Sequence, residues 1–232
     1  MVNSTVKSHV IIVAAGTGNR FGGDIPKQFA VLDGKPVIMR TIDLFRSAIP
    51  DAEILLVISP SEEARWKSMC IDYGYDSPTV VFGGATRTES VKNALARIPA
   101  DDSLVLIHDG ARPLLSRQTL LNIIEAASQA GVEAVIPCTP LTDSLMTNCP
   151  VDAKPVDRSK YVAVQTPQTF RASTLKAAYT AMPEGVALSD DAAVVEHFSN
   201  VQIKLVAGDV RNIKITYPLD LEIASLYLKE KN

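Results

Sequence analysis

The sequence has little of several features that mark other classes of protein. Its three cysteines, Cys70, Cys138 and Cys149, are widely spaced and form no Cys-x-x-Cys pair, which argues against a disulfide framework and a zinc site. A net charge of −3 leaves no broad basic surface, which argues against a nucleic-acid partner. No apolar run approaches membrane-spanning length, and the N-terminus lacks the long apolar segment of a signal peptide. We therefore expect a cytoplasmic protein without a membrane segment.

The sequence does contain an alternation of strand and helix patterns along 232 residues, of which 47% are hydrophobic. This suits a single α/β domain over residues 1–232, with a mostly parallel sheet covered by helices. Strands are expected over residues 9–15, 54–58, 79–82, 104–107, 134–137, 201–206 and 213–216. Helices are expected over residues 36–47, 61–73, 86–98, 117–130, 172–182, 189–198 and 218–229. We expect Ser61 and Ser189 to be the N-caps of two of these helices.

The alternation breaks between residues 139 and 165, which contain Pro140, Pro150 and Pro155 and show no helical period. Residues 143–147 and 160–164 are expected to pair as a long hairpin arm around the proline-rich middle. Such an arm has little core of its own, so we expect it to pack on another subunit.

A glycine-rich loop follows the first strand, and two cations, Arg20 and Lys27, come after its glycines. Small residues allow backbone N–H groups to approach an anion closely and to form a phosphate-binding concavity. These small residues are Ala14, Ala15, Gly16 and Gly18. The stretch therefore predicts a nucleoside triphosphate site, because a turn that merely connects two elements does not explain the two cations.

Two common nucleotide-binding loops do not fit this stretch. In a dinucleotide-binding turn the third glycine would stand where Phe21 is, and the next strand, 54–58, is followed by Ser59–Pro60 instead of an acidic residue. A Walker A loop needs Gly-Lys-Ser/Thr, whereas Lys27 lies between Pro26 and Gln28. The first mismatch disfavours an NAD-dependent oxidoreductase, and the second excludes a P-loop.

Four segments resemble the methylerythritol-phosphate cytidylyltransferase family of the non-mevalonate isoprenoid pathway, and the resemblance spans essentially the whole chain. The segments read AAGTGNRFGGDIPKQF (14–29), HDGARP (108–113), QTPQTF (165–170) and NIKIT (212–216). The resemblance implies transfer of CMP from CTP to a phosphorylated polyol, with release of pyrophosphate and use of Mg²⁺. It also implies a Rossmann-like nucleotidyltransferase fold and a homodimer joined by the protruding 139–165 arm. The first two segments are shared with other polyol-phosphate enzymes, so a ribitol-5-phosphate cytidylyltransferase remains the alternative.

The resemblance also assigns residues to the CTP half of the site. Arg20 and Lys27 would be catalytic, since they would neutralise the triphosphate as the crowded phosphorus centre forms. Asp109 ends an apolar strand, where ligands meet open α/β sheets, and is the tentative Mg²⁺ ligand. The nucleotide-binding positions would be Ala14, Ala15, Gly16, Thr17, Gly18, Gly84, Ala85, Ser90, Asp109 and Gly110, with Gly83 beside the cytosine.

The acceptor half of the site would draw on both the body and the arm. The positions are Asp109, Arg112, Ser144, Arg158, Thr166, Ser189 and Lys214. Ser144 and Arg158 would act in the neighbouring subunit, as the family's arm does. Ser144 and Ser189 stand where threonine is frequent in the family, and Arg211 stands where an acidic residue is often found. His108 is expected to be structural, because an attacking phosphate needs no strong base.

A non-catalytic nucleotide-binding regulator on the same fold is a further alternative. Such a protein would be expected to have lost Arg20, Lys27 or Asp109, and this sequence contains all three. The enzyme is therefore the favoured interpretation.

Overall fold

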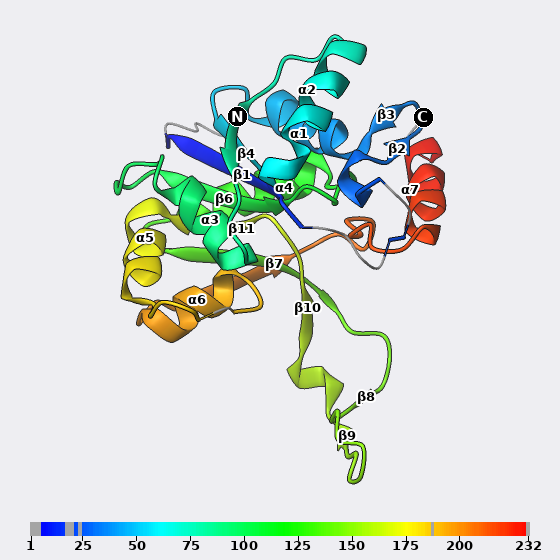
Figure 1. Ribbon diagram of the computed structural model, residues 1–232. Helices are drawn as coiled ribbons and strands as arrows, with labels where there is room; N and C mark the ends of the chain where they lie inside the picture. The colour runs from blue at the N-terminus through cyan, green and yellow to red at the C-terminus, as the bar shows by residue number, and fades with distance from the viewer. Residues whose placement is uncertain (1–5, 17–20, 23–24, 187, 231–232) are drawn as a thin grey trace.

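The computed structural model describes residues 6–16, 21–22, 25–186 and 188–230, and its central element is an eight-stranded sheet (Figure 1). The strand order is β10-β7-β11-β6-β1-β4-β5, with β12 paired to β7. The strands are β1 (Ser8–Ala14), β4 (Glu53–Ile58), β5 (Thr79–Phe82), β6 (Leu104–Asp109), β7 (Ala134–Pro140), β10 (Val162–Val164), β11 (Gln168–Arg171) and β12 (Ile203–Ala207). The pairings β1–β4, β1–β6, β4–β5 and β7–β12 are parallel. β10 pairs antiparallel with β7, and β11 lies antiparallel between β6 and β7. The predicted mostly parallel mixed sheet is therefore confirmed.

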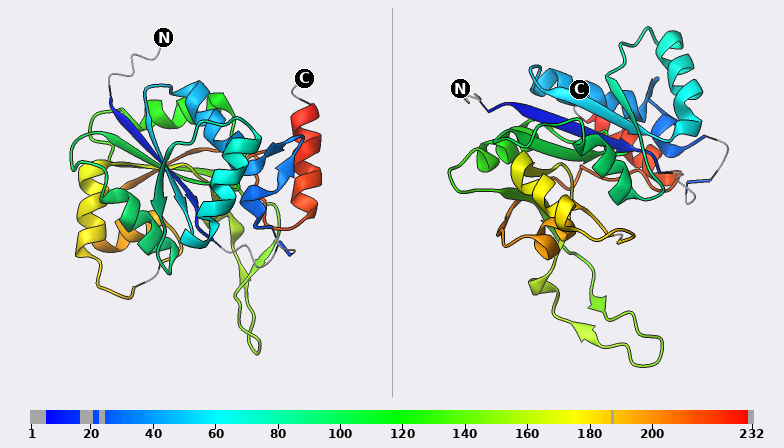
Figure 2. Two further views of the ribbon diagram at one scale, coloured as in Figure 1. Left: turned by 45° about the horizontal axis from the view of Figure 1, so that its top comes forward. Right: turned by 60° about the vertical axis from the view of Figure 1, so that its left-hand side comes forward.

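Helices cover both faces of this sheet (Figures 1 and 2). They are α1 (Val37–Ala48), α2 (Glu63–Asp72), α3 (Arg87–Leu95), α4 (Arg117–Ala127), α5 (Ala172–Ala181), α6 (Asp191–Phe198) and α7 (Leu219–Lys229). Side chains alternate across β1, so Val10 and Ile12 pack with α1, α2 and α4, whereas Ile11 packs with α3, α5 and α6. A strand buried on both faces must be apolar throughout, as this one is.

A smaller layer lies at one edge of the sheet, where α7 packs beside the hairpin of β2 (Val31–Leu32) and β3 (Lys35–Pro36). Its apolar cluster includes Leu114 and Ile215. The predicted strand over 213–216 is wrong, because this segment is a loop whose Ile215 N–H donates a single bond to Ala111 O. Side-chain bonds hold the loop instead, since Asp220 accepts from the backbone N–H groups of Thr216 and Tyr217.

Both predicted helix caps are wrong by one or two residues. The turn before α2 is a short 3-10 helix, η2 (Pro60–Glu62), and its N-cap is Ser59, not Ser61. The Ser59 hydroxyl accepts from Ser61 N–H. Asp190, not Ser189, caps α6, because its carboxylate accepts from Ala193 N–H at 2.9 Å. Serine and aspartate are both good N-caps, so their spacing alone does not choose between neighbours.

The arm is present, but its predicted pairing of 143–147 with 160–164 is wrong. β10 instead pairs with the end of β7, where Val162 lies opposite Pro140, and β8 (Leu145–Met146) pairs with β9 (Pro155–Val156) farther out. A short 3-10 helix η3 (Arg158–Lys160) lies between β9 and β10. The arm extends well away from the helices and sheet in every view (Figures 1 and 2).

The helices of the described residues are all too short or too polar to cross a membrane.

Candidate active site

A cavity of about 430 Å³ lies at the carboxyl ends of β1, β5 and β6. β1 is parallel to β6 on one side and to β4 on the other, and β4 is parallel to β5. The residues that follow β1, β5 and β6 therefore meet at one edge of the sheet, where open α/β sheets bind ligands. The lining comprises Val13, Ala14, Ala15, Gly16, Lys27, Gln28, Gly84, Ala85, Thr86, Arg87, Ser90, Asp109, Ala111, Lys214 and Thr216. Segments predicted separately from the sequence are thus brought together around one space.

The first side of the cavity is the backbone that leaves β1. Ala14, Ala15 and Gly16 line it, and the buried side chain of Gln28 donates to Ala14 O at 2.9 Å and to Gly16 O at 3.2 Å. Lys27 also lines the cavity, from the short 3-10 helix η1 (Lys27–Phe29). Gln28 was not predicted as a site residue, although it follows Lys27 in the motif. The predicted residues Thr17, Gly18 and Arg20 lie outside the described residues.

The second side is the tight turn between β5 and α3, at the predicted cytosine pocket. A Cβ atom on Gly83 would lie 2.6 Å from Ala15 Cβ, and one on Gly84 would lie 2.5 Å from Glu89 Cβ, so glycine is required at both positions. Ser90 Oγ accepts from Gly84 N–H at 3.1 Å and donates to Thr86 O at 2.8 Å. The Ser90 hydroxyl therefore orders this turn from within.

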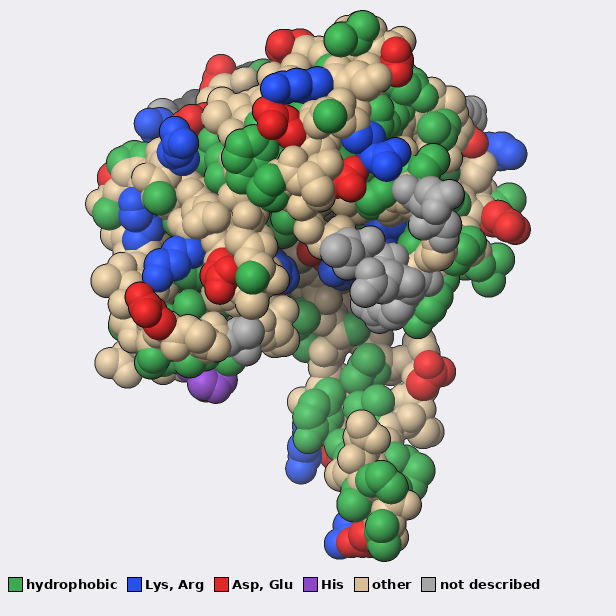
Figure 3. Space-filling view, in the orientation of Figure 1, with side chains coloured by type: hydrophobic (Ala, Val, Ile, Leu, Met, Phe, Trp, Pro, Cys, Tyr) green, Lys and Arg blue, Asp and Glu red, His purple; other side chains and the backbone are tan. Residues whose placement is uncertain are grey.

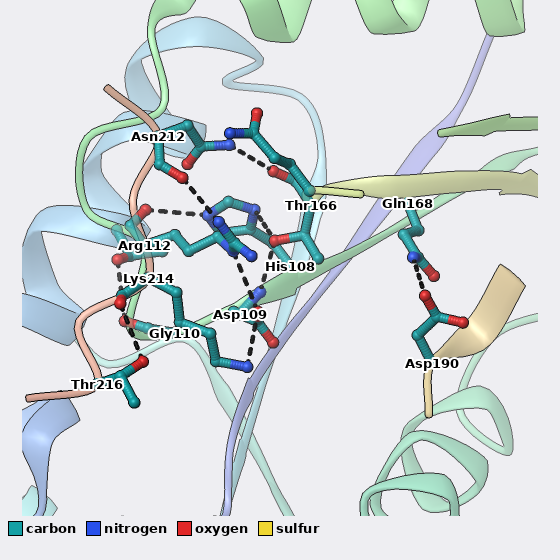
Figure 4. Close-up of polar contacts among 12 residues, drawn as sticks. His108, Asp109, Gly110, Arg112, Thr166, Gln168, Asp190, Asn212, Lys214 and Thr216 are labelled. Atoms are coloured by element: carbon teal, nitrogen blue, oxygen red, sulfur yellow. Dashed lines mark hydrogen bonds and ion pairs between the residues drawn. The ribbon is translucent and has the colours of Figure 1, made fainter. Parts of the chain in front are cut away.

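The third side carries charged groups from the end of β6 and from two loops (Figure 4). Asp109 Oδ2 contacts Lys214 Nζ at 3.0 Å and Arg112 Nε at 3.2 Å. Burial by itself raises the pKa of Asp109, but Lys214, Arg112 and the more distant Arg87 outweigh it and hold that pKa well below its usual range. Asp109 is therefore an anion at neutral pH, and the two predicted acceptor-side cations lie against it.

Behind Asp109 lies a buried polar cluster (Figure 4). His108 is fully buried, with Nε2 3.1 Å from Arg112 O and Nδ1 2.9 Å from Thr166 Oγ1. Burial lowers the pKa of His108 to about 4, so the imidazole is neutral near pH 7. The expected structural role of His108 agrees with this geometry. Gly110 also lies here, and its N–H donates to Val13 O.

A second buried ion pair joins α3 to α6. Arg87 lines the cavity and donates to Asp191 Oδ2 at 2.6 Å, and Tyr179 donates to Asp191 Oδ1 at 2.6 Å. Asp191 is fully buried, and burial disfavours the charged form of Arg87, but the carboxylate more than compensates and raises the pKa of Arg87. Arg87 is therefore held as a cation at the cavity wall.

Some predicted site residues lie away from this cavity. Ser144 and Arg158 are exposed on the arm, where the Arg158 guanidinium donates to Thr142 O. Ser189 is exposed before α6, and Arg211 lies beside Asp209. Thr166 is buried behind Asp109, and neither it nor Arg112 is among the lining residues.

A magnesium ion held by protein side chains alone does not fit the described part of the chain, where no group of three or more His, Cys, Asp or Glu side chains could hold a metal. Asp109 is the one carboxylate among the described lining residues, and two cations already contact its Oδ2. A single carboxylate does fit Mg²⁺ that binds together with phosphate oxygens and keeps several waters.

Comparisons with known proteins agree with this geometry. The family described as IspD, 2-C-methyl-D-erythritol 4-phosphate cytidylyltransferase, matches residues 8–230. The chain is 44% identical over 223 residues to the 2-C-methyl-D-erythritol 4-phosphate cytidylyltransferase of Porphyromonas gingivalis, covering 96% of this chain and 98% of that protein. It is 42% identical to the Phocaeicola vulgatus protein of the same name, covering 95% and 99%.

The fold comparison gives the same result. The crystal structure of 4-diphosphocytidyl-2C-methyl-D-erythritol synthase from Anaerococcus prevotii is similar with a TM-score of 0.80 at 28% identity, covering 97% of this chain and 96% of that one. Sequence and fold therefore agree along nearly the whole length, and this chain belongs to the 2-C-methyl-D-erythritol 4-phosphate cytidylyltransferase family.

Proposed function

We propose that this chain transfers CMP from CTP to 2-C-methyl-D-erythritol 4-phosphate and releases pyrophosphate, in the synthesis of isoprenoid precursors. The observation that carries the proposal is the cavity itself. It combines a small-residue turn between β5 and α3, which leaves room for a flat base, with the small residues that follow β1 and the charged side chains of Lys27, Asp109 and Lys214. The names of its relatives favour methylerythritol phosphate over ribitol phosphate as the acceptor.

In this reaction an oxygen of the acceptor phosphate attacks the α-phosphorus of CTP, and the bond to the pyrophosphate oxygen breaks. Both reactants are anions, so the protein must neutralise and align them more than supply a nucleophile. Lys27, with Arg20 as the sequence predicts, would stabilise the triphosphate as negative charge builds on the pyrophosphate oxygens. The backbone held by Gln28 would bring its N–H groups to the same phosphates.

Asp109 and Lys214 would act between the two substrates. Lys214 supplies positive charge for the acceptor phosphate, and Asp109 fixes the Lys214 ammonium by the 3.0 Å contact. Asp109, together with the phosphates, would also hold Mg²⁺, which neutralises phosphate charge when it is bound. Ser90, Gly84 and Ala85 would receive the cytosine, with backbone groups fixed by the Ser90 hydroxyl.

The arm would complete the site of a second copy in a cytoplasmic homodimer. Every residue from 139 to 164 is exposed or half-buried. Met146 is 58% exposed, Val151 97% and Tyr161 52%, and Figure 3 shows hydrophobic side chains along this arm. Burial of such side chains against a partner would stabilise a dimer, and it would carry Ser144 and Arg158 to the partner's acceptor phosphate.

The test is pyrophosphate release from CTP and Mg²⁺ with a panel of polyol phosphates. We expect release with methylerythritol phosphate and much less with ribitol 5-phosphate. No release with any acceptor would overturn the enzyme assignment, and a preference for ribitol 5-phosphate would overturn the acceptor.

A further inference from the structure

The root of the arm, defined as residues 137–140 and 162–165, lies against the segment that carries Lys214. Gln165 follows the returning strand of the arm, and its backbone N–H still donates to a carbonyl of β7 at 2.7 Å. The segment 208–216 joins β12 to α7 (Figure 1). Because β12 pairs with β7, the chain enters this segment directly beside the arm root.

The side-chain amide of Gln165 is matched to the backbone of a single residue in that segment, Asp209. Its Nε2 donates to Asp209 O at 2.8 Å, and its Oε1 accepts from Asp209 N–H at 3.1 Å. These partners fix the orientation of the amide, because a carbonyl can only accept and a backbone N–H can only donate. Gln165 is 7% exposed, so water has little access to the two bonds.

Gly208 allows the arm root and the segment to approach closely enough for this contact. A Cβ atom at position 208 would lie 2.4 Å from Gln165 Oε1 and 3.1 Å from Cys138 O, so a side chain there would displace the Gln165 amide. The Gly208 N–H donates to Cys138 O at 2.8 Å, just beyond the pairing of β12 with β7. The arm root therefore holds both residues that begin the segment, Gly208 and Asp209.

Asp209 also begins the turn that leads to Lys214. Its backbone O accepts from Asn212 N–H at 2.9 Å as well as from Gln165. Lys214 follows in a stretch without helix or strand, and its Nζ lies 3.0 Å from Asp109 Oδ2 at the cavity (Figure 4). In such a stretch no ladder of backbone bonds sets the path of the chain, so the bonds at Asp209 and Asn212 determine where Lys214 emerges.

We propose that Gln165 is a positioning residue for Lys214. By holding Asp209 against the arm root, Gln165 sets the direction in which the chain leaves β12, and so the place of the Lys214 ammonium. Gln165 is not among the described lining residues of the cavity, so it acts through Lys214 and not on a substrate. This role rests on the proposed function, in which Lys214 supplies charge for the acceptor phosphate.

The experiment is a double-mutant cycle of Gln165→Met and Lys214→Ala, read as kcat/KM for methylerythritol phosphate. Gln165→Met keeps a side chain of similar size but loses both bonds to Asp209, so we expect a loss of about 10- to 100-fold, the size typical of a misplaced group. In the Lys214→Ala background the same substitution should cost less than about twofold, because no ammonium remains to be misplaced. Equal losses in both backgrounds, or no loss in either, would overturn the proposal.

Two further variants control the cycle. Gly208→Ala should displace the Gln165 amide from the opposite side and reproduce the loss, which keeps the proposal testable if Gln165→Met does not fold. Gln129→Met is the matched control, because the exposed Gln129 accepts from Lys204 of β12 at 2.6 Å, and its loss removes an amide contact to the strand itself. Full activity in Gly208→Ala, or a loss in Gln129→Met equal to that in Gln165→Met, would contradict the role of Gln165.

Hydrogen exchange measures the contact without turnover. Peptides that cover residues 208–214 should exchange faster in Gln165→Met than in the unsubstituted chain, whereas peptides from β1 and β6 should be unchanged. Unaltered exchange over residues 208–214 would show that Gln165 does not hold the segment. If the chain released no pyrophosphate with any acceptor, the exchange result would still stand, so failure of the proposed function and failure of this contact are distinguishable.

Discussion

The body of the molecule and its arm differ in how far their side chains are buried and in where these side chains find partners. The body buries Phe170, Ile11 and Trp66 almost completely, and its charged groups near the cavity are paired. In the arm, residues 139–164 are all exposed or half-buried, and the Arg158 guanidinium donates to the arm's own backbone at Thr142 O. We infer from this difference that the proposed CTP site is preformed within one chain, and we propose that the arm finds its partners on a second copy.

Substitutions in the body and in the arm are expected to differ most in their effect on the free energy of unfolding. Phe170→Ala should lower the free energy of unfolding by about 3–5 kcal/mol, because it opens a cavity in a fully buried position of β11. Val151→Ala, at the 97% exposed tip of the arm, should change it by less than about 0.5 kcal/mol. Urea unfolding at matched protein concentration measures both. A large loss from Val151→Ala would show that the arm carries stability comparable to the body.

The next largest effect is expected on turnover, from Lys27 in the proposed CTP site of the body. Lys27→Ala should lower kcat by roughly 10²- to 10³-fold, the usual result of removing a charge that stabilises a transition state. Pyrophosphate release measures the loss, and circular dichroism should show an intact fold. Lys67→Ala is the matched control, since Lys67 is exposed on α2 and pairs with Glu63. Near-normal turnover in Lys27→Ala would refute the assigned role.

A smaller effect is expected from the arm. Arg158→Ala should lower kcat/KM for the acceptor about 10- to 100-fold, because the phosphomonoester loses a charge-assisted partner. CTP binding, measured by calorimetry without the acceptor, should be unchanged. Lys160→Ala removes a neighbouring exposed cation of the same arm and should have little effect. Similar losses in both variants would mean that the net charge of the arm matters and the position of Arg158 does not.

The smallest effect is expected on the pH dependence of stability, where a buried histidine should differ from an exposed one. Burial lowers the pKa of His9, although Glu53 opposes the shift, so the unfolded chain binds a proton that the folded chain does not. This contribution to stability is complete above pH 6.5 and declines as the pH falls toward the folded pKa, with a slope of at most about 1.4 kcal/mol per pH unit for one proton.

His9→Gln should therefore flatten the fall in unfolding free energy below pH 6.5, whereas substitution of the exposed His197 by Gln should not. Urea denaturation over that range provides the comparison. If both substitutions altered the curve equally, burial of His9 would not be the cause of the slope.

The sequence predicted the parts of the fold that depend on local pattern. The apolar run of β1, its burial on both faces, and the strand over residues 79–82 are confirmed. Lys27, Asp109 and Lys214 were all named from motifs, and the structure gathers them around one cavity. Periodicity and strand direction account for the place of Asp109, because the ends of parallel strands meet at one edge of the sheet, whereas Lys214 was named only through the family resemblance.

The parts that were missed depend on contacts between distant residues. Arg112 and Asn212 are 100 positions apart, and Asp109 and Thr166 are 57 apart, so no spacing rule relates them. The pairing of the arm was wrong because β10 bonds to the continuation of β7, and sequence alone does not set that register.

The central claim is that the body of one chain and the arm of another form one active site. The most direct test mixes Lys27→Ala chains with Arg158→Ala chains, each of which should retain only a small fraction of the wild-type activity alone, and isolates the mixed dimers. If the arm acts on the partner, one of the two sites combines an intact body with an intact arm, and about half of the wild-type activity per dimer should return. No recovery in verified mixed dimers would contradict the claim and place Arg158 in the site of its own chain.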